Sequence, residues 1–371
     1  MLARLLFPAP ASSAEASTVT TTTASPRMEI VFVLDTTGSM GPMIEGAKKK
    51  IWSIANKLKS AQPTPEIRFG LVGYRDRRDT YVTQTFGLSA SLDDVYGHLS
   101  AFKAEGGGDE PESVNEALAR SLSDIAWNPD PQVLRAVFLI GDAPPHMDYP
   151  DDIKWEQSCR EAKKRDILIN TLQCWSSPET ERVWREIARL AGGAYTSILR
   201  GGSTTAIDTR FDGDIVGIAR AMSGTVVLYG APDQRAGADR NRSLLEAMSV
   251  EGIADRSSFL SKGDFGAVIT GTGDLVVELL AGRITLAKID PQFLDPKLAN
   301  LPPAERDARI MQLVERRRKL QTGLQNLLDQ REAAVAERMK SATDTGDLVE
   351  LSPFEVIQDQ AESRGYSFKK K

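Results

Sequence analysis

Apolar segments of strand length alternate with amphipathic segments of helix length along residues 28–200, and this alternation limits the fold most strongly. Residues 29–34 form a continuous β-branched and aromatic run, which is typical of a parallel strand buried on both faces. Residues 44–58 carry apolar side chains at three- and four-residue steps, which predicts a helix. The pattern continues with expected strands at 67–74, 81–86, 133–140, 167–172 and 194–198, and expected helices at 95–102, 111–125, 155–164 and 180–190. It predicts an α/β fold with a Rossmann-like, doubly wound and mainly parallel sheet.

Charge and composition exclude several classes of function. The chain has 46 Lys and Arg against 51 Asp and Glu, a net charge of −5, which argues against a general nucleic-acid-binding protein. No segment approaches the ~18 apolar residues that a transmembrane helix needs. With two histidines and two cysteines in the whole chain, a zinc site built from these residues is nearly excluded. Any bound metal must therefore be held by oxygen ligands.

Three polar segments are placed to meet at the carboxyl edge of the predicted sheet, where folds of this kind bind ligands. The first is 35–39, directly after the first strand; the second is the glycine-rich stretch 106–112; the third, 141–146, follows the strand at 133–140. Carboxylate and hydroxyl oxygens suit Mg²⁺, with Mn²⁺ or Ca²⁺ as alternatives. A simpler reading is that the acid and hydroxyl groups of the first segment only cap the following helix. The candidate metal ligands are Asp35, Thr37, Ser39, Asp109 and Asp142.

These motifs resemble a known family. Asp35-x-Thr37-x-Ser39 is similar to the first element of the metal-ion-dependent adhesion site of von Willebrand factor A-type domains, usually Asp-x-Ser-x-Ser. The glycines with Asp109 resemble the second element, and Asp142 after a hydrophobic strand resembles the third. The resemblance implies a Rossmann-like sheet and a Mg²⁺ site that binds partner proteins, typically through a partner's acidic side chain.

The sequence around the motifs, residues 33–40 and 107–112, is similar to that of a bacterial and protist subgroup of these domains. One position departs from the usual pattern, because many family members carry Thr where Asp109 stands. Three carboxylates around a divalent cation would weaken its attraction for an incoming carboxylate. Alternatively, Asp109 acts through a water molecule or recruits a basic partner.

Residues beside the expected site are further candidates. Asp76, in the loop after the second strand, is expected to orient the metal site. His146 and Asp148 are expected to form a partner-binding rim. The alternative is that all three are ordinary loop residues. Cys159 and Cys174 either form a disulfide, as in an exported protein, or remain separate thiols, as in the cytosol.

Residues 1–27 show no secondary-structure period. Their short apolar patch, followed by small residues, favours a secretory signal and an exported, periplasmic or secreted, protein over a cytoplasmic one. The alternative is a disordered leader, with Met28 opening the folded domain.

The remaining residues, 201–371, are expected to be mostly helical. The longest helical pattern, 302–340, is interrupted by Arg317 and Arg331 and predicts either a helical hairpin packed on the sheet domain or a coiled-coil seam for self-association. Shorter elements are expected as helices at 211–222, 243–259 and 275–286, a strand at 224–229 and a loop at 264–273.

Two functions follow from these patterns. The first is a non-catalytic, divalent-metal-dependent module that binds protein partners. The alternative is a Mg²⁺-dependent phosphoryl-transfer enzyme of the haloacid-dehalogenase type, with Asp35 as nucleophile. That alternative rests on a faint resemblance of 35–39 to the nucleophile loop of that superfamily, and of Asp142 with Asp148 to its metal-binding end.

Overall fold

The computed structural model describes residues 26–108, 110–198, 209–262, 269–270, 273–344 and 353–368. The candidate ligand Asp109, residues 1–25 of the possible signal at 1–27, and most of the predicted loop at 264–273 lie outside these residues.

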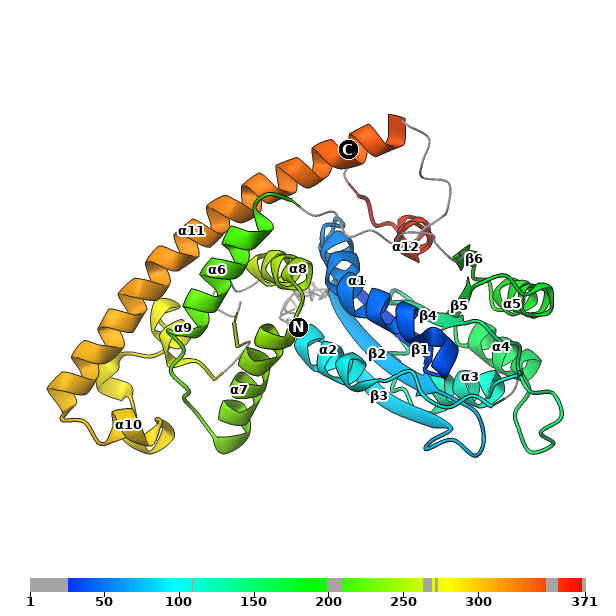
Figure 1. Ribbon diagram of the computed structural model, residues 1–371, viewed down its shortest axis with the longest axis horizontal. Helices are drawn as coiled ribbons and strands as arrows, with labels where there is room; N and C mark the ends of the chain where they lie inside the picture. The colour runs from blue at the N-terminus through cyan, green and yellow to red at the C-terminus, as the bar shows by residue number, and fades with distance from the viewer. Residues whose placement is uncertain are drawn as a thin grey trace, which may run out of the picture.

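Six strands form one sheet in the order β3-β2-β1-β4-β5-β6 (Figure 1). Every neighbouring pair is parallel except β2 and β3, which are antiparallel. The central strands are buried along nearly their whole length, because helices cover both faces of the sheet. The predicted doubly wound, mainly parallel sheet is confirmed. The strands are β1 (Arg27–Asp35), β2 (Glu66–Tyr74), β3 (Thr83–Ser89), β4 (Leu134–Gly141), β5 (Leu168–Cys174) and β6 (Tyr195–Ile198).

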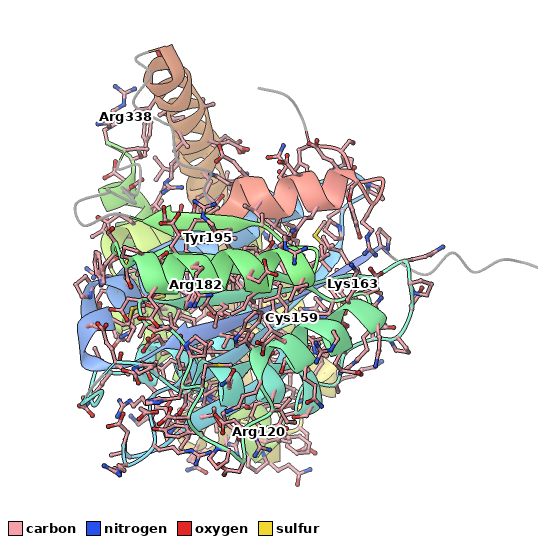
Figure 2. All side chains as sticks on the ribbon, turned by 90° about the vertical axis from the view of Figure 1, so that its right-hand side faces the viewer. Arg120, Cys159, Lys163, Arg182, Tyr195 and Arg338 are labelled. Carbon is pink, nitrogen blue, oxygen red and sulfur yellow. The ribbon has the colours of Figure 1, made fainter. Side chains whose placement is uncertain are left out.

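Alternation along β1 divides the core into two layers. Ile30 and Leu34 point into the layer covered by α1 (Gly41–Lys59) and α2 (Leu92–Ala101). Val31 and Val33 point into the opposite layer. That layer is covered by α3 (Val114–Ser123), α4 (Trp155–Lys164) and α5 (Pro178–Leu190). Figure 2 looks onto this second side of the molecule, where Cys159 and Arg182 are labelled.

The two cysteines are free thiols. Cys159 on α4 packs in one core layer, whereas Cys174 at the end of β5 packs in the other. The disulfide alternative is therefore wrong, because the sheet lies between the two sulfur atoms.

The C-terminal region is mostly helical, as predicted, but two helices are bounded differently. The segment expected as one helix at 243–259 is two helices, because Ser249 caps a new helix through a bond from the Gly252 amide (3.1 Å). The helix expected at 275–286 ends at Leu280, and Gly282 follows in a left-handed conformation. The helices are α6 (Asp212–Ser223), α7 (Pro232–Ala247), α8 (Val250–Ser261), α9 (Leu275–Leu280), α10 (Pro296–Ala299), α11 (Pro303–Asp344) and α12 (Pro353–Glu362), with short 3-10 turns at Gly38–Met40 (η1), Leu286–Lys288 (η3) and Pro291–Phe293 (η4).

The strand expected at 224–229 does not form. Leu228 and Tyr229 make only isolated bridges, to Asp274 and Leu294. These partners lie in loops rather than in a strand, so there is no ladder that the segment could extend.

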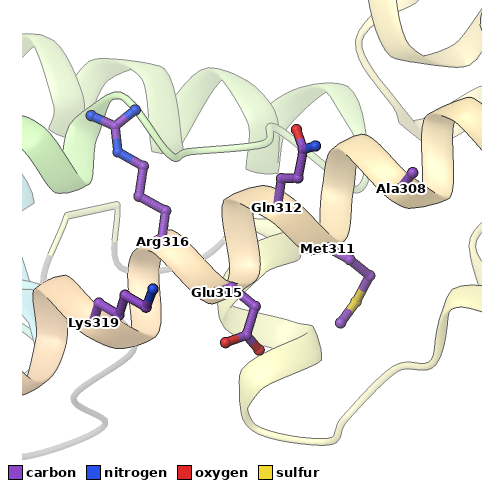
Figure 3. Close-up of a pocket in the computed structure, with 6 residues that line it drawn as sticks. All are labelled: Ala308, Met311, Gln312, Glu315, Arg316 and Lys319. Carbon is purple, nitrogen blue, oxygen red and sulfur yellow. The ribbon is translucent and has the colours of Figure 1, made fainter.

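The long helix α11 is confirmed, and it packs along α6, α8 and α9 rather than forming a hairpin (Figure 1). Its two interrupting arginines are buried and paired. Arg317 donates to Asp274 Oδ2 (2.9 Å), and Arg331 donates to Asp212 Oδ1 (2.8 Å). Ion pairs thus let charged residues occupy the buried stripe of the helix. The opposite side of α11 is a shallow, open surface (Figure 3), and self-association through this helix stays a prediction.

The last helix, α12, returns to the sheet at the end opposite to the carboxyl edge. Gln360 and Asn170 exchange two side-chain hydrogen bonds (2.7 and 3.1 Å), and Arg364 pairs with Asp166, just before β5. Ile357 belongs to the same hydrophobic cluster as β1 and α1. Part of the C-terminal region therefore shares one hydrophobic cluster with one face of the sheet. Among the described residues, no helix combines the length and apolarity needed to cross a membrane.

Candidate metal-binding site

The three predicted polar segments meet at the carboxyl edge of the sheet. Asp35 ends β1 and Asp142 follows β4, its neighbour in the sheet. Between them, Gly141 packs so closely that a Cβ on it would lie 3.1 Å from Asp35 Oδ2. The second segment joins them through the Gly38 amide, which donates to the Gly106 carbonyl (3.1 Å). The convergence inferred from strand order is thus present, although Asp109 itself lies outside the described residues.

Asp35 is fully buried and uses its two carboxylate oxygens differently. Oδ1 accepts hydrogen bonds from the amide (2.8 Å) and the hydroxyl (2.7 Å) of Thr37. Oδ2 has no hydrogen-bond partner within the described part of the chain. Ser39 is exposed, and its hydroxyl lies 3.4 Å from Thr37 Oγ1. The loop therefore presents one buried carboxylate oxygen and one exposed hydroxyl.

The helix-capping alternative for this loop is not observed. The residue preceding α1 is Met40, and neither it nor Thr37, which precedes the short turn η1, makes a side-chain capping bond. Asp35 instead accepts a hydrogen bond from the Thr37 amide, two residues further along the chain, which stabilises the turn rather than the helix.

Glu112 is a fourth carboxylate at the site that the sequence reasoning missed. Its amide donates to the Pro144 carbonyl (3.0 Å), and its carbonyl accepts from the His146 amide (3.0 Å), so it joins the second segment to the third. Its side chain is buried, Oε2 has no partner among the described residues, and Oε1 would lie 2.9 Å from a Cβ on Gly107.

The helix expected at 111–125 places Glu112 in its first turn, where an acidic residue is common, so the sequence does not single it out as a ligand. The helix α3 in fact begins at Val114. The available signal was its place in the same acidic, glycine-rich segment as the predicted ligand.

The carboxylates repel one another and are shielded from water. Burial raises the pKa of Asp35 to about 7, against the hydrogen bonds from Thr37, and the charge of Asp142 raises it further. Burial also raises the pKa of Glu112 to about 9, with added repulsion from Asp35, Asp76 and other acids. A cation at this edge would relieve both effects, since it favours the charged carboxylates.

The predicted rim residues Asp76, His146 and Asp148 are brought together, but only one of them faces solvent. His146 Nδ1 lies 2.7 Å from Asp148 Oδ1, and its Nε2 lies 3.5 Å from Asp76 Oδ2. Asp76 also accepts from the hydroxyls of Ser113 (2.8 Å) and Tyr149 (2.9 Å). Because Asp76 and His146 are buried, they hold the rim loops together, while Asp148 is exposed.

Across the described ranges, no group of three or more His, Cys, Asp or Glu side chains is arranged to hold a metal ion. A cation among these loops would therefore need hydroxyl oxygens or water in addition to carboxylates, as hard divalent cations accept.

The fold and site define a class: a doubly wound α/β domain with carboxylate and hydroxyl groups gathered at the carboxyl edge of its sheet. The model of the von Willebrand factor A domain family matches residues 29–200.

Curated relatives match about a third of the chain. An alpha-protein kinase vwkA of Dictyostelium discoideum is 33% identical over 124 residues, which is 33% of this chain and 19% of the relative. A putative ariadne-like RING finger protein R811 of Acanthamoeba polyphaga mimivirus is 29% identical over 119 residues, 32% of this chain and 11% of the relative. The matched segment thus spans less than a fifth of either relative.

Solved structures of proximal thread matrix protein 1 from the mussel byssus are also similar. One crystal form has a TM-score of 0.38 at 17% identity, and covers 47% of this chain and 42% of that one. Another, described as having a zinc-occupied metal-ion-dependent adhesion site (MIDAS) motif, has a TM-score of 0.37 at 18% identity, and also covers 47% of this chain and 42% of that one.

Proposed function

We propose that the chain is a non-catalytic module that binds a protein partner through a divalent cation, with Mg²⁺ as the natural ion and Mn²⁺ or Ca²⁺ as substitutes. The observation that carries the proposal is Asp35 Oδ2, a fully buried carboxylate oxygen with no hydrogen-bond partner in the described structure. An unpartnered buried acid is costly, and a cation is the natural group to satisfy it. The match of the von Willebrand factor A domain family model to residues 29–200 supports the same proposal.

The donor atoms present fit a hard divalent cation. Asp35, Ser39 and Asp142 would hold it, Thr37 would orient the Asp35 carboxylate through its two hydrogen bonds, and Glu112 would add a carboxylate from the second segment. Asp109 remains a further proposed ligand from that segment. The bound cation would supply a Lewis-acidic position that attracts an acidic side chain of the partner.

The phosphoryl-transfer alternative has no specific observation in its favour. Asp148, which it would place at the metal, is exposed and bonded to His146 instead. The kinase activity in one relative's name belongs to that protein, of which the match covers 19%.

Metal titration of purified protein tests the proposal. Mg²⁺ binding should be seen by calorimetry for the parent chain and lost in Asp35→Ala, while Asp214→Ala, an exposed acid on α6, should bind as the parent does. Circular dichroism would check that each variant is folded. A pull-down from native extract, with Mg²⁺ and with chelator, then tests partner capture. Equal capture in chelator would contradict the proposed mechanism.

A further inference from the structure

The loop between β2 and β3 contains an arginine in a backbone conformation that arginine rarely adopts. Arg78 has φ of 81°, and the Asp79 amide donates to the Asp76 carbonyl (3.3 Å) to close a four-residue turn. Arg78 is thus the third residue of a tight turn that calls for positive φ, a position where glycine is usual. Strain of this kind concentrates at functional sites, where it serves to place a side chain.

The loop contains three arginines, and two of them are tied to the chain's own groups. Arg75 is buried, donates to Thr80 Oγ1 (2.7 Å) and the Lys103 carbonyl (2.8 Å), and stacks on Tyr81. Arg77 donates to Asp151 and Asp152 and stacks on the ring of Tyr149. Arg78, in contrast, is exposed and makes no ion pair or hydrogen bond with any described residue.

The turn is fixed against the candidate metal site. Asp79 Oδ2 accepts from the Asp76 amide (3.2 Å) and from the Gly107 amide (3.1 Å). Gly107 in turn packs on Thr37, since a Cβ on it would lie 3.0 Å from Thr37 Cβ. The loop that carries Arg78 is therefore bonded directly to the segments that surround Asp35, so this residue lies beside the site.

Two exposed acids in the loop after β4 already have partners within the chain. Asp148 is bonded to His146, and Asp151 is paired with Arg77. A free cation beside a cation-binding site is complementary to a ligand with more than one negative charge.

From these contacts we infer that Arg78 selects the partner: the site takes an acidic peptide segment with two carboxylates, one for the bound cation and one for Arg78. This inference rests on the proposed metal-dependent function and names the chemistry of its partner. An exposed ion pair contributes modestly, so the second carboxylate should strengthen binding about two- to fivefold at low salt, and less as salt rises.

Synthetic peptides of glycine and serine that carry no, one or two glutamates at graded spacings are the probes. Binding to the full chain is measured with saturating Mg²⁺ and with chelator. The two-glutamate peptide of best spacing should bind more tightly than the one-glutamate peptide, and only with Mg²⁺. This preference should disappear in Arg78→Gly and in Arg78→Asn, both of which tolerate positive φ. It should persist in Arg182→Ala, a matched exposed arginine on α5 (Figure 2).

Stability separates a partner contact from a structural role. Because glycine relieves the strained turn, Arg78→Gly should melt at a temperature no lower than the parent. A clear loss of stability in both variants would mean that the arginine is structural, and would overturn the inference.

The two proposals fail in different ways. If no acidic peptide binds in a Mg²⁺-dependent way, the proposed function fails. If the one-glutamate peptide binds with Mg²⁺ but the second glutamate adds nothing, or its advantage survives in both Arg78 variants, the inference fails while the function stands.

Discussion

The buried carboxylate of Asp35 should destabilise the metal-free protein, and its removal should reveal by how much. In the folded chain its pKa rises from 3.8 to about 7, because burial disfavours the charged form. Each pKa unit corresponds to about 1.4 kcal/mol, so a shift of about three units corresponds to about 4 kcal/mol. Asp35→Asn keeps an acceptor oxygen for Thr37 and removes the charge, and should stabilise the metal-free protein by up to about that amount at pH 8.

The sign of the pH dependence follows from the same shift. A raised folded-state pKa means that the folded protein binds the proton more tightly than the unfolded chain does. The stability associated with protonated Asp35 is therefore fully present below pH 3.8 and is lost as the pH rises toward about 7. The advantage of Asp35→Asn should be small at pH 4, grow through this window and level off above it.

Urea unfolding in chelator from pH 4 to pH 8 measures this difference, with Asp214→Asn as an exposed-acid control. With saturating Mg²⁺ the order should reverse, because only the parent chain gains the free energy of metal binding. An Asn variant that is less stable than the parent at pH 8 in chelator, or equally stabilised by Mg²⁺, would refute the reasoning.

Three other perturbations have defined outcomes. Glu112→Gln should weaken Mg²⁺ binding about tenfold or more by calorimetry. It should also stabilise the metal-free protein at pH 7, because the folded-state pKa of Glu112 is raised from 4.5 to about 9 and only the unfolded chain ionises at that pH; unchanged affinity would remove Glu112 from the site. Arg317→Met should lower the free energy of unfolding in urea by about 3–5 kcal/mol, because it leaves the buried carboxylate of Asp274 without its partner. Adding Asp274→Asn should restore part of the lost stability. If the two substitutions lower stability additively, the two residues are not a coupled pair. Cys159 and Cys174 should both react with a thiol reagent in non-reducing denaturant. Neither should react in the native protein, where both are buried and burial raises the pKa of Cys159 to about 12. An unfolded chain without reactive thiols would contradict the two free cysteines.

The sheet and its first ligand loop could be predicted because their signals are local. A strand buried on both faces, such as β1, requires an unbroken apolar run, and Asp35 directly after it must fall at the carboxyl edge. Strand order then brings Asp142 beside it, since β1 pairs with β4. These features need no knowledge of distant contacts.

The misjudged features depend on contacts between distant residues. Arg317 and Arg331 interrupt the apolar stripe of the helix, and only their buried acidic partners, Asp274 and Asp212, explain them. In the sequence, Glu112 fits the acidic first turn of a helix, and only the structure shows that α3 begins two residues later, at Val114. Likewise, Cys159 and Cys174 could be separated only once the sheet was seen to lie between them.

The most direct test of the account is the position of a bound cation. Crystals grown with Mn²⁺ should give one anomalous peak at the carboxyl edge of the sheet, among the oxygen atoms of Asp35, Ser39 and Asp142, and no such peak in Asp35→Ala. A map without a peak there, or with Mn²⁺ bound only elsewhere on the chain, would contradict the claim that these loops hold a divalent ion.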